Sequence, residues 1–174
     1  MGMVLKPQDV VVLLKLVAWR RESWSYQELA ESLGMSASEV HAGLNRAFAA
    51  GLVDVDRKRP VRAALSEFLL HGLKYMCPPE RGATTRGVPT CHGASFVSEA
   101  FGAGDEPVPV WPHSKGGARG VAFEPLYRSV PEAAGRDEEF YRLLVLVDLL
   151  RGGNARERPW AADELKKALA QAQK

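Results

Sequence analysis

The residues best suited to chemistry in this sequence are cations and short polar side chains, and they fall within residues 25–59. Three consecutive cations, Arg57, Lys58 and Arg59, end the stretch. Upstream, polar side chains recur at helical spacing: Ser38, His41, Asn45 and Arg46. Cations in loops contact phosphates, and Asn, Arg and short polar groups on a helix can hydrogen-bond to base edges in the major groove of DNA. The pattern indicates nucleic-acid binding.

Two short helices joined by a tight turn would position these groups. The first is predicted over residues 26–32 and the second over residues 37–50. Gly34 can take a left-handed conformation and so end the first helix. Ser36 followed three residues later by Glu39 forms a capping box that starts the second helix. The stretch is therefore predicted to be a helix-turn-helix.

Apolar spacing divides the second helix into two faces. The predicted inward face comprises Val40, Leu44, Ala47 and Phe48. The predicted outward face comprises Ser38, Glu39, His41, Ala42, Asn45 and Arg46. Asn45 and Arg46 are the foremost candidates for contacts with bases or phosphates, with Tyr26 and Ser36 in support. The alternative is an ordinary helical hairpin whose polar side chains are merely solvated.

A short strand and a basic turn are predicted after the second helix. Alternation over residues 52–55 favours a strand, and residues 56–60 form the turn that carries the three cations. In this position the turn would be the wing of a winged helix, placed to contact phosphates or the minor groove. A solvated loop is the alternative. The preceding helix, residues 8–21, is too apolar for a surface helix and should be buried; Arg20 and Arg21 at its end suit a helix C-terminus and could also reach a phosphate.

The remainder of the chain is predicted to be helix, then an irregular Gly/Pro-rich region, then helix again. A helix is expected over residues 62–75. The expected elements of the irregular region are a short helix and a two-stranded hairpin: residues 95–101, 108–111 and 121–123, with a turn at 115–119. Two amphipathic helices are expected over residues 137–150 and 159–171.

The predicted fold class is therefore mainly α within α+β, in three segments. The segments are a winged helix-turn-helix domain, an extended region with a short hairpin, and a helical segment that either dimerises or completes its own domain: residues 1–75, 76–131 and 132–174.

Other chemistry finds less support in the sequence. Residues 81–90 hold Gly, Thr and Arg but lack the Gly-Lys-Ser/Thr signature of a phosphate loop. The candidate metal ligands are Cys77, Cys91, His92, His71 and His113, and they lack a Cys-x-x-Cys pair. Because no catalytic triad order is present either, we expect no enzyme activity, no metal and no cofactor. The aromatic side chains of Trp111, Phe123 and Tyr127 could line a pocket but are more typical of a core.

Bulk properties set further bounds. The 174 residues are 46% hydrophobic, with a net charge of +2, so any DNA affinity must come from local clusters of cations. No apolar run is long enough to span a membrane. The N-terminus lacks the features of a signal peptide, and two cysteines imply no disulfide framework, so we expect a cytoplasmic location.

The segment SYQELAESLGMSASEVHAGLNRAFAAGLVDVDRKRP resembles winged-helix bacterial transcriptional regulators of the MarR-like type. Two later segments, KYMCPPERGATTRGVPTCHGA and VWPHSKGGARGVAFEPLYRSVPEAA, are similar to small regulators found beside toxin-antitoxin or phage-defence genes, and to antitoxins whose partner is a nucleotidyltransferase. The resemblance implies a homodimer that binds an inverted repeat in double-stranded DNA and represses its own operon. MarR-like proteins begin with a longer helix and dimerise through both chain ends, so here a dimer would depend on residues after Val61.

The alternative to a DNA-binding regulator is an antitoxin or adaptor that uses the winged-helix scaffold to bind a partner protein. The two hypotheses differ in what they require of the cations. DNA binding is favoured if Arg46 and the cations of residues 57–59 share one surface. A protein partner is favoured if they are separated and neutralised by neighbouring carboxylates.

Overall fold

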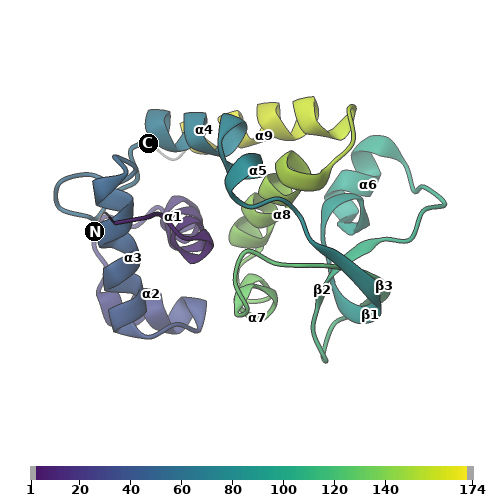
Figure 1. Ribbon diagram of the computed structural model, residues 1–174, viewed down its shortest axis with the longest axis horizontal. Coiled ribbons are helices and arrows are strands. Elements are labelled where there is room, and N and C mark those ends of the chain that lie inside the picture. The colour runs from purple at the N-terminus through teal and green to yellow at the C-terminus, as the bar shows by residue number, and fades with distance from the viewer. Residues whose placement is uncertain (1–2, 172–174) are drawn as a thin grey trace.

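The computed structural model describes residues 3–171 and shows a mainly helical chain with one small three-stranded sheet (Figure 1). The predicted α+β class is confirmed at this level. The predicted segments 1–75 and 132–174 extend onto residues 1–2 and 172–174, which lie outside the described part. Within that part no helix has the length and apolar character needed to cross a membrane.

Helix α1 (Pro7–Trp19) is the buried centre of the N-terminal half, as the apolar pattern over residues 8–21 predicts. Residues 10–14 are each at most 1% exposed. The helix contacts α3 on one side and α8 on another. Its first turn holds Pro7, which loses nothing by lacking an N–H there, and Asp9, whose carboxylate accepts the Lys6 N–H at 2.9 Å.

Helices α2 (Tyr26–Leu33) and α3 (Ala37–Ala49) follow the predicted boundaries closely. Gly34 ends α2 at φ 64°, in the left-handed conformation that glycine adopts without steric cost. Ser36 starts α3, where its hydroxyl accepts the Glu39 N–H at 3.1 Å, so the predicted capping box is confirmed. The pair lies at one end of the molecule, with α1 beside it (Figure 1).

The chain after α3 reverses in a tight loop rather than in a regular hairpin. The strand predicted over residues 52–55 is reduced to one bridge between Val53 and Pro60. The reason is local: the Asp54 carboxylate accepts the N–H groups of Lys58 at 2.8 Å and Arg59 at 3.1 Å, which turns the backbone before pairing can extend.

The helix predicted over residues 62–75 is divided into α4 (Arg62–His71) and α5 (Leu73–Met76). Gly72 separates them. An ideal Cβ at Gly72 would lie 3.0 Å from the Phe68 ring, so a side chain at this position would have to displace that ring slightly. Residues 62–75 therefore bend where the sequence pattern predicts a continuous helix.

The predicted hairpin is wrong, because its two arms pair in parallel and a third strand, which the sequence did not reveal, pairs with both of them. Strand β1 (Arg81–Pro89) pairs antiparallel with both β2 (Pro109–Pro112) and β3 (Ala118–Phe123), while β2 and β3 pair in parallel. Glycine permits the tight crossing: an ideal Cβ at Gly87 would lie 2.1 Å from a carbonyl oxygen of β2. Because β1 is largely exposed and rich in Gly and Thr, it lacks the alternation of a half-buried strand.

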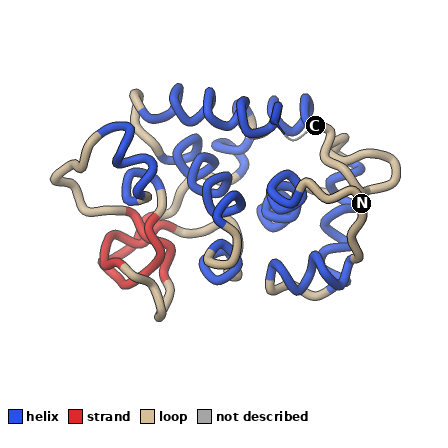
Figure 2. Tube along the Cα trace, turned by 180° about the vertical axis from the view of Figure 1, so that it is seen from behind, coloured by secondary structure: helices blue, strands red, loops and turns tan. Residues whose placement is uncertain are grey.

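The short helix predicted over residues 95–101 is confirmed as α6 (Ser95–Phe101), which follows a single 3₁₀ turn, η1 (Cys91–Gly93). Figure 2 shows the three strands gathered at the end of the molecule opposite α2 and α3. The Gly/Pro-rich region, residues 76–131, therefore contains the whole sheet.

Three helices complete the chain: α7 (Val130–Ala134), α8 (Glu138–Gly152) and α9 (Glu157–Gln171). The helices predicted over residues 137–150 and 159–171 are confirmed. The apolar stripe of α8 is fully covered by this same chain, at Phe140, Leu143, Leu144 and Val147. Because α8 contacts α1 and α9, the C-terminal helices serve the chain's own core. Their part in a dimer stays a prediction.

A buried polar network joins the sheet to α8. Asp148 is 2% exposed and accepts hydrogen bonds from Thr90 Oγ1 and Trp111 Nε1, both at 2.7 Å, and from Arg151 at 2.8 Å. Burial raises the pKa of Asp148. Trp111 and Phe123, at 1% and 0% exposed, are thus core side chains, as their aromatic character favoured.

Candidate nucleic-acid interface

One face of α3 is buried in the protein core and the opposite face is exposed to solvent. Val40, Leu44 and Ala47 are 0% exposed, as predicted. On the far side, Ser38 and His41 are exposed and Asn45 is partly exposed. A helix fixed along its whole buried edge presents its outer side chains as a rigid row.

His41 connects this row to the start of α2. Its ring lies edge-on to Tyr26, with centroids 5.3 Å apart. Its Nδ1 is 3.3 Å from the Asn45 amide nitrogen, one turn along the helix. Tyr26 in turn meets Trp24 edge-on at 5.6 Å. Four predicted or neighbouring site residues therefore form one continuous strip from α3 to the segment between α1 and α2.

The N-terminal end of α3 is tied down by hydrogen bonds. The Glu39 carboxylate accepts the Ser36 N–H and the Tyr127 hydroxyl, both at 2.7 Å. These bonds, the backbone bond foremost, lower the pKa of Glu39 to about 2. The Ser36 hydroxyl is occupied as the helix cap and lies 3.1 Å from the Ser38 hydroxyl. Glu39 is therefore a structural anchor and Ser38 the freer of the two serines.

Arg46 does not point outward, which corrects the prediction. Its Nε and one terminal nitrogen each donate to Asp9 at 2.8 Å, and the Arg46 side chain is 15% exposed while that of Asp9 is 0% exposed. The hydrogen bonds to Asp9 raise the pKa of Arg46. The physical reason is that the buried Asp9 carboxylate on α1 needs a paired cation. The Arg46 guanidinium supplies that charge and therefore lies against α1 rather than on the outer face of α3.

Phe48 was predicted to face inward, and this prediction is also wrong. It is 39% exposed rather than inward-facing, and the Arg57 guanidinium lies over its ring at 4.5 Å. The backbone of Arg57 is in the left-handed region, at φ 56°. That conformation folds the loop back so that Arg57 covers the end of α3.

The other two loop cations diverge from Arg57. The Lys58 ammonium donates to the Trp24 carbonyl at 3.2 Å and lies over the rings of Trp24 and Tyr26, at 4.0 and 5.0 Å. Arg59 is exposed and turns toward the end of α1. Of the three cations that are adjacent in sequence, Arg57 therefore packs on the end of α3, while Lys58 and Arg59 turn toward the end of α1.

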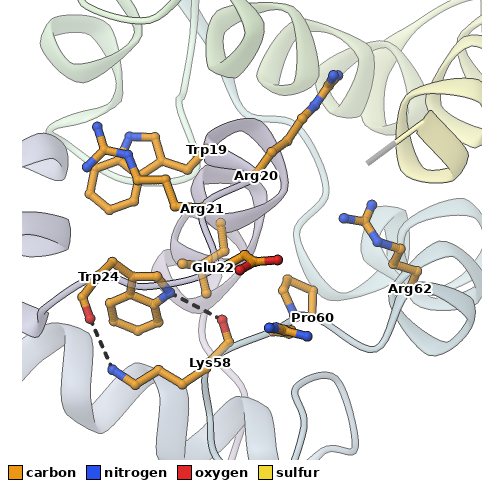
Figure 3. Close-up of a pocket in the computed structure, with 10 residues that line it drawn as sticks. Trp19, Arg20, Arg21, Glu22, Trp24, Lys58, Pro60 and Arg62 are labelled. Carbon is orange, nitrogen blue, oxygen red and sulfur yellow. Dashed lines mark hydrogen bonds between the residues drawn. The ribbon is translucent and has the colours of Figure 1, made fainter. Parts of the chain in front are cut away.

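Arg59 belongs to a cleft of about 420 Å³ between the end of α1, the loop and the start of α4 (Figure 3). The lining side chains are predominantly cationic and aromatic: Leu16, Trp19, Arg20, Arg21, Glu22, Trp24, Lys58, Arg59, Pro60 and Arg62. Sequence reasoning noted Arg20 and Arg21 as possible phosphate contacts. It missed Trp24 and Arg62, which carry no local signal because only folding brings them to this cleft.

The metal and phosphate-loop alternatives find no geometric counterpart. Cys77 and Cys91 are buried free thiols, and the described residues include no group of three potential metal ligands. Residues 81–90 are mostly strand β1 rather than a loop.

Comparison of the chain with protein-family models, curated proteins and solved structures finds no match. The MarR-like resemblance therefore stays a prediction.

Proposed function

We propose that this chain binds double-stranded DNA, with α3 as the recognition helix of a winged helix-turn-helix and the loop after it as a short wing. The observation that carries the proposal is the open face of α3, which is polar, made of small side chains and fixed from behind by a fully buried face.

The dimensions of α3 suit a major groove. Its 13 residues form a rod about 20 Å long and about 10–12 Å in diameter with side chains, and the groove is about 12 Å wide. The outward row contains Ser38, Ala42 and Asn45, whose small size lets the helix backbone approach the bases. Asn45 is the strongest base-reading candidate, because an amide can pair with adenine through two hydrogen bonds. Arg46 leaves the proposed contact set.

Contacts with the DNA backbone would come from the side of the loop. Lys58 and Arg59 lie beside the strip formed by Trp24, Tyr26 and His41. A duplex seated on α3 would bring one phosphate strand across this strip, where cations position the protein without reading sequence. The resemblance to MarR-like regulators adds a role to this proposal, that of a transcriptional regulator. More narrowly, the role is that of a homodimeric repressor of its own operon with a toxin partner.

A protein-interaction module is the second candidate, and two observations favour it. Arg46 is held by Asp9, and Arg57 is packed on Phe48. Lys58 also donates to the Trp24 carbonyl, so three of the four cations predicted to contact DNA make contacts within the protein. The open row on α3 is compatible with a partner protein as well as with a groove.

A duplex-binding titration separates the two candidates. Fluorescence anisotropy with labelled fragments of the DNA upstream of the gene would be measured for the wild type and for His41→Ala/Asn45→Ala. If α3 reads bases, we expect the double variant to lose about 1–3 kcal/mol per lost base contact on the preferred fragment, with little change on unrelated DNA.

The matched control is Arg119→Ala, which removes an exposed cation from β3 at the far end of the molecule. It should bind as the wild type does. Wild-type protein that binds no fragment, even at 50 mM salt where non-specific electrostatic binding is strong, would refute DNA binding and leave the protein-partner candidate.

A further inference from the structure

The cleft between α1, the wing loop and α4 is more strongly charged than any part of the α3 face. Five of its ten lining side chains are cationic and one is a carboxylate. The cations come from three separate segments of the chain: Arg20, Arg21, Lys58, Arg59 and Arg62. A chain with a net charge of only +2 therefore concentrates cations at one hollow on its surface.

The contacts that Arg20 and Lys58 make within the protein offset little of their charge. Arg20 reaches Glu139 at 3.1 Å, but both side chains are about 40% exposed, and such a pair contributes little. Lys58 donates to a backbone carbonyl group at 3.2 Å. Burial, and then the proximity of Arg20, lower the pKa of Arg62. The cations thus repel one another, and an anion between them would relieve that repulsion.

The backbone around the cleft also favours an anion. Helix α4 begins there, and its N-cap, Val61, provides no side-chain cap. The N-terminus of a helix carries partial positive charge and free N–H donors. Arg20 takes the left-handed conformation, φ 50°, at the end of α1. That turn separates the side chains of Arg20 and Arg21, which Figure 3 shows extending in different directions from the end of α1.

Two tryptophan rings, Trp19 and Trp24, belong to the apolar part of the cleft wall. The Arg21 guanidinium stacks on Trp19 with its central carbon 4.1 Å from the ring centre. Trp24 donates its indole N–H to the Lys58 carbonyl at 3.3 Å, so its ring is fixed in place (Figure 3). Stacking on an aromatic ring orients a guanidinium while leaving its N–H edge available for a planar, two-oxygen acceptor.

We propose that this cleft is a binding site for a phosphate-bearing ligand with at least two negative charges. Guanidinium groups match phosphate oxygens through paired hydrogen bonds, and a volume of about 420 Å³ exceeds the size of a single phosphate. The phosphates belong either to a DNA backbone that continues past α3 or to a free nucleotide. Only the first source rests on the proposed function.

The test uses inorganic pyrophosphate as the free probe and a 20-base-pair duplex as the DNA probe. The cleft variant is Arg21→Gln/Arg59→Gln, because both side chains are exposed and neither anchors the fold. The matched control is Arg86→Gln/Arg119→Gln, two exposed arginines that face each other across β1 and β3. Calorimetry measures pyrophosphate binding, and anisotropy measures duplex binding across a salt series.

For a free ligand, the cleft variant should bind pyrophosphate at least tenfold more weakly, while the control stays within twofold of the wild type. For a DNA source, the cleft variant should weaken binding to every duplex sequence and reduce the salt slope by about two, since each phosphate contact contributes about 0.9. Either result supports the site and identifies its source.

The inference is overturned if pyrophosphate does not bind the wild type and the cleft variant leaves duplex binding unchanged, or if the control variant loses as much as the cleft variant. Pyrophosphate binding without any duplex binding would refute the proposed function and leave the cleft as a site for a free ligand.

Discussion

Replacing Arg46 by alanine tests the main disagreement between sequence and structure. By sequence, Arg46 is a DNA contact whose loss weakens binding. By structure, it donates two hydrogen bonds of 2.8 Å to a carboxylate that is 0% exposed. Arg46→Ala would therefore leave Asp9 charged, buried and unpaired, and the expected effect is on folding.

The size of the effect follows from the burial of the pair. Removing one partner of a buried ion pair costs about 3–5 kcal/mol, because the remaining charge keeps its desolvation penalty. Because the Lys6 N–H still donates to Asp9 in the variant, we expect a loss of unfolding free energy near the lower end of this range. The free energy of unfolding of a typical domain is about 5–15 kcal/mol, so the variant would lose a large part of its stability.

Urea unfolding followed by circular dichroism measures the free energy of unfolding directly. Two further variants sharpen the result. Arg46→Lys keeps the charge but not the paired hydrogen bonds, so it should fall between the wild type and the alanine variant. Asp9→Leu/Arg46→Met removes both charges and should recover much of the loss, less about 1 kcal/mol for the lost cap of α1.

Arg136→Ala provides the control for an exposed pair. It removes the partner of Glu132, and both side chains are more than half exposed, so the expected change is below about 1 kcal/mol. The structural role of Arg46 is refuted if Arg46→Ala changes the unfolding free energy no more than Arg136→Ala does while it weakens duplex binding. That outcome would return Arg46 to the DNA-contact set.

Two other predictions concern α3. A backbone N–H and the Tyr127 hydroxyl lower the folded-state pKa of Glu39 to about 2, so the stability that Glu39 contributes is present above its unfolded pKa of about 4.3 and is lost as the pH falls toward 2. In acid titrations monitored by circular dichroism, Glu39→Gln should therefore lose less stability than the wild type over that pH range. Identical profiles for the two proteins would contradict the role given to Glu39. Gly43→Ala would place a Cβ 2.8 Å from Asp9 Oδ1, so urea unfolding should show a loss of about 1–3 kcal/mol, against under about 0.5 kcal/mol for Gly117→Ala, whose Cβ meets nothing within 4 Å; equal losses would mean that Gly43 is not required for close packing.

The sequence determined the local structure of residues 7–50 because the signals there are short-range. A capping box needs residues three apart, a left-handed helix end needs one glycine, and a buried face needs apolar residues at helical spacing. The boundaries of α1, α2 and α3 follow from these signals. The helices α8 and α9 were predictable for the same reason.

The sheet could not be predicted because its pairing is long-range. Strand β1 meets β2 more than twenty residues later, and its exposed Gly and Thr positions lack the alternation that marks a strand. The local pattern predicts an antiparallel hairpin of β2 and β3, whereas both strands pair antiparallel with β1 and therefore run parallel to each other.

The candidate site divides in the same way. The outward positions of Ser38, His41 and Asn45 on α3 could be predicted from the helical spacing in the sequence. The direction of Arg46 depended on Asp9, 37 residues away, and the cleft arose because α1, the loop and α4 each brought cations to one place. Charges attract or repel according to their distance in space, so only the tertiary structure decided that Arg46 pairs with Asp9 and that five cations line one cleft.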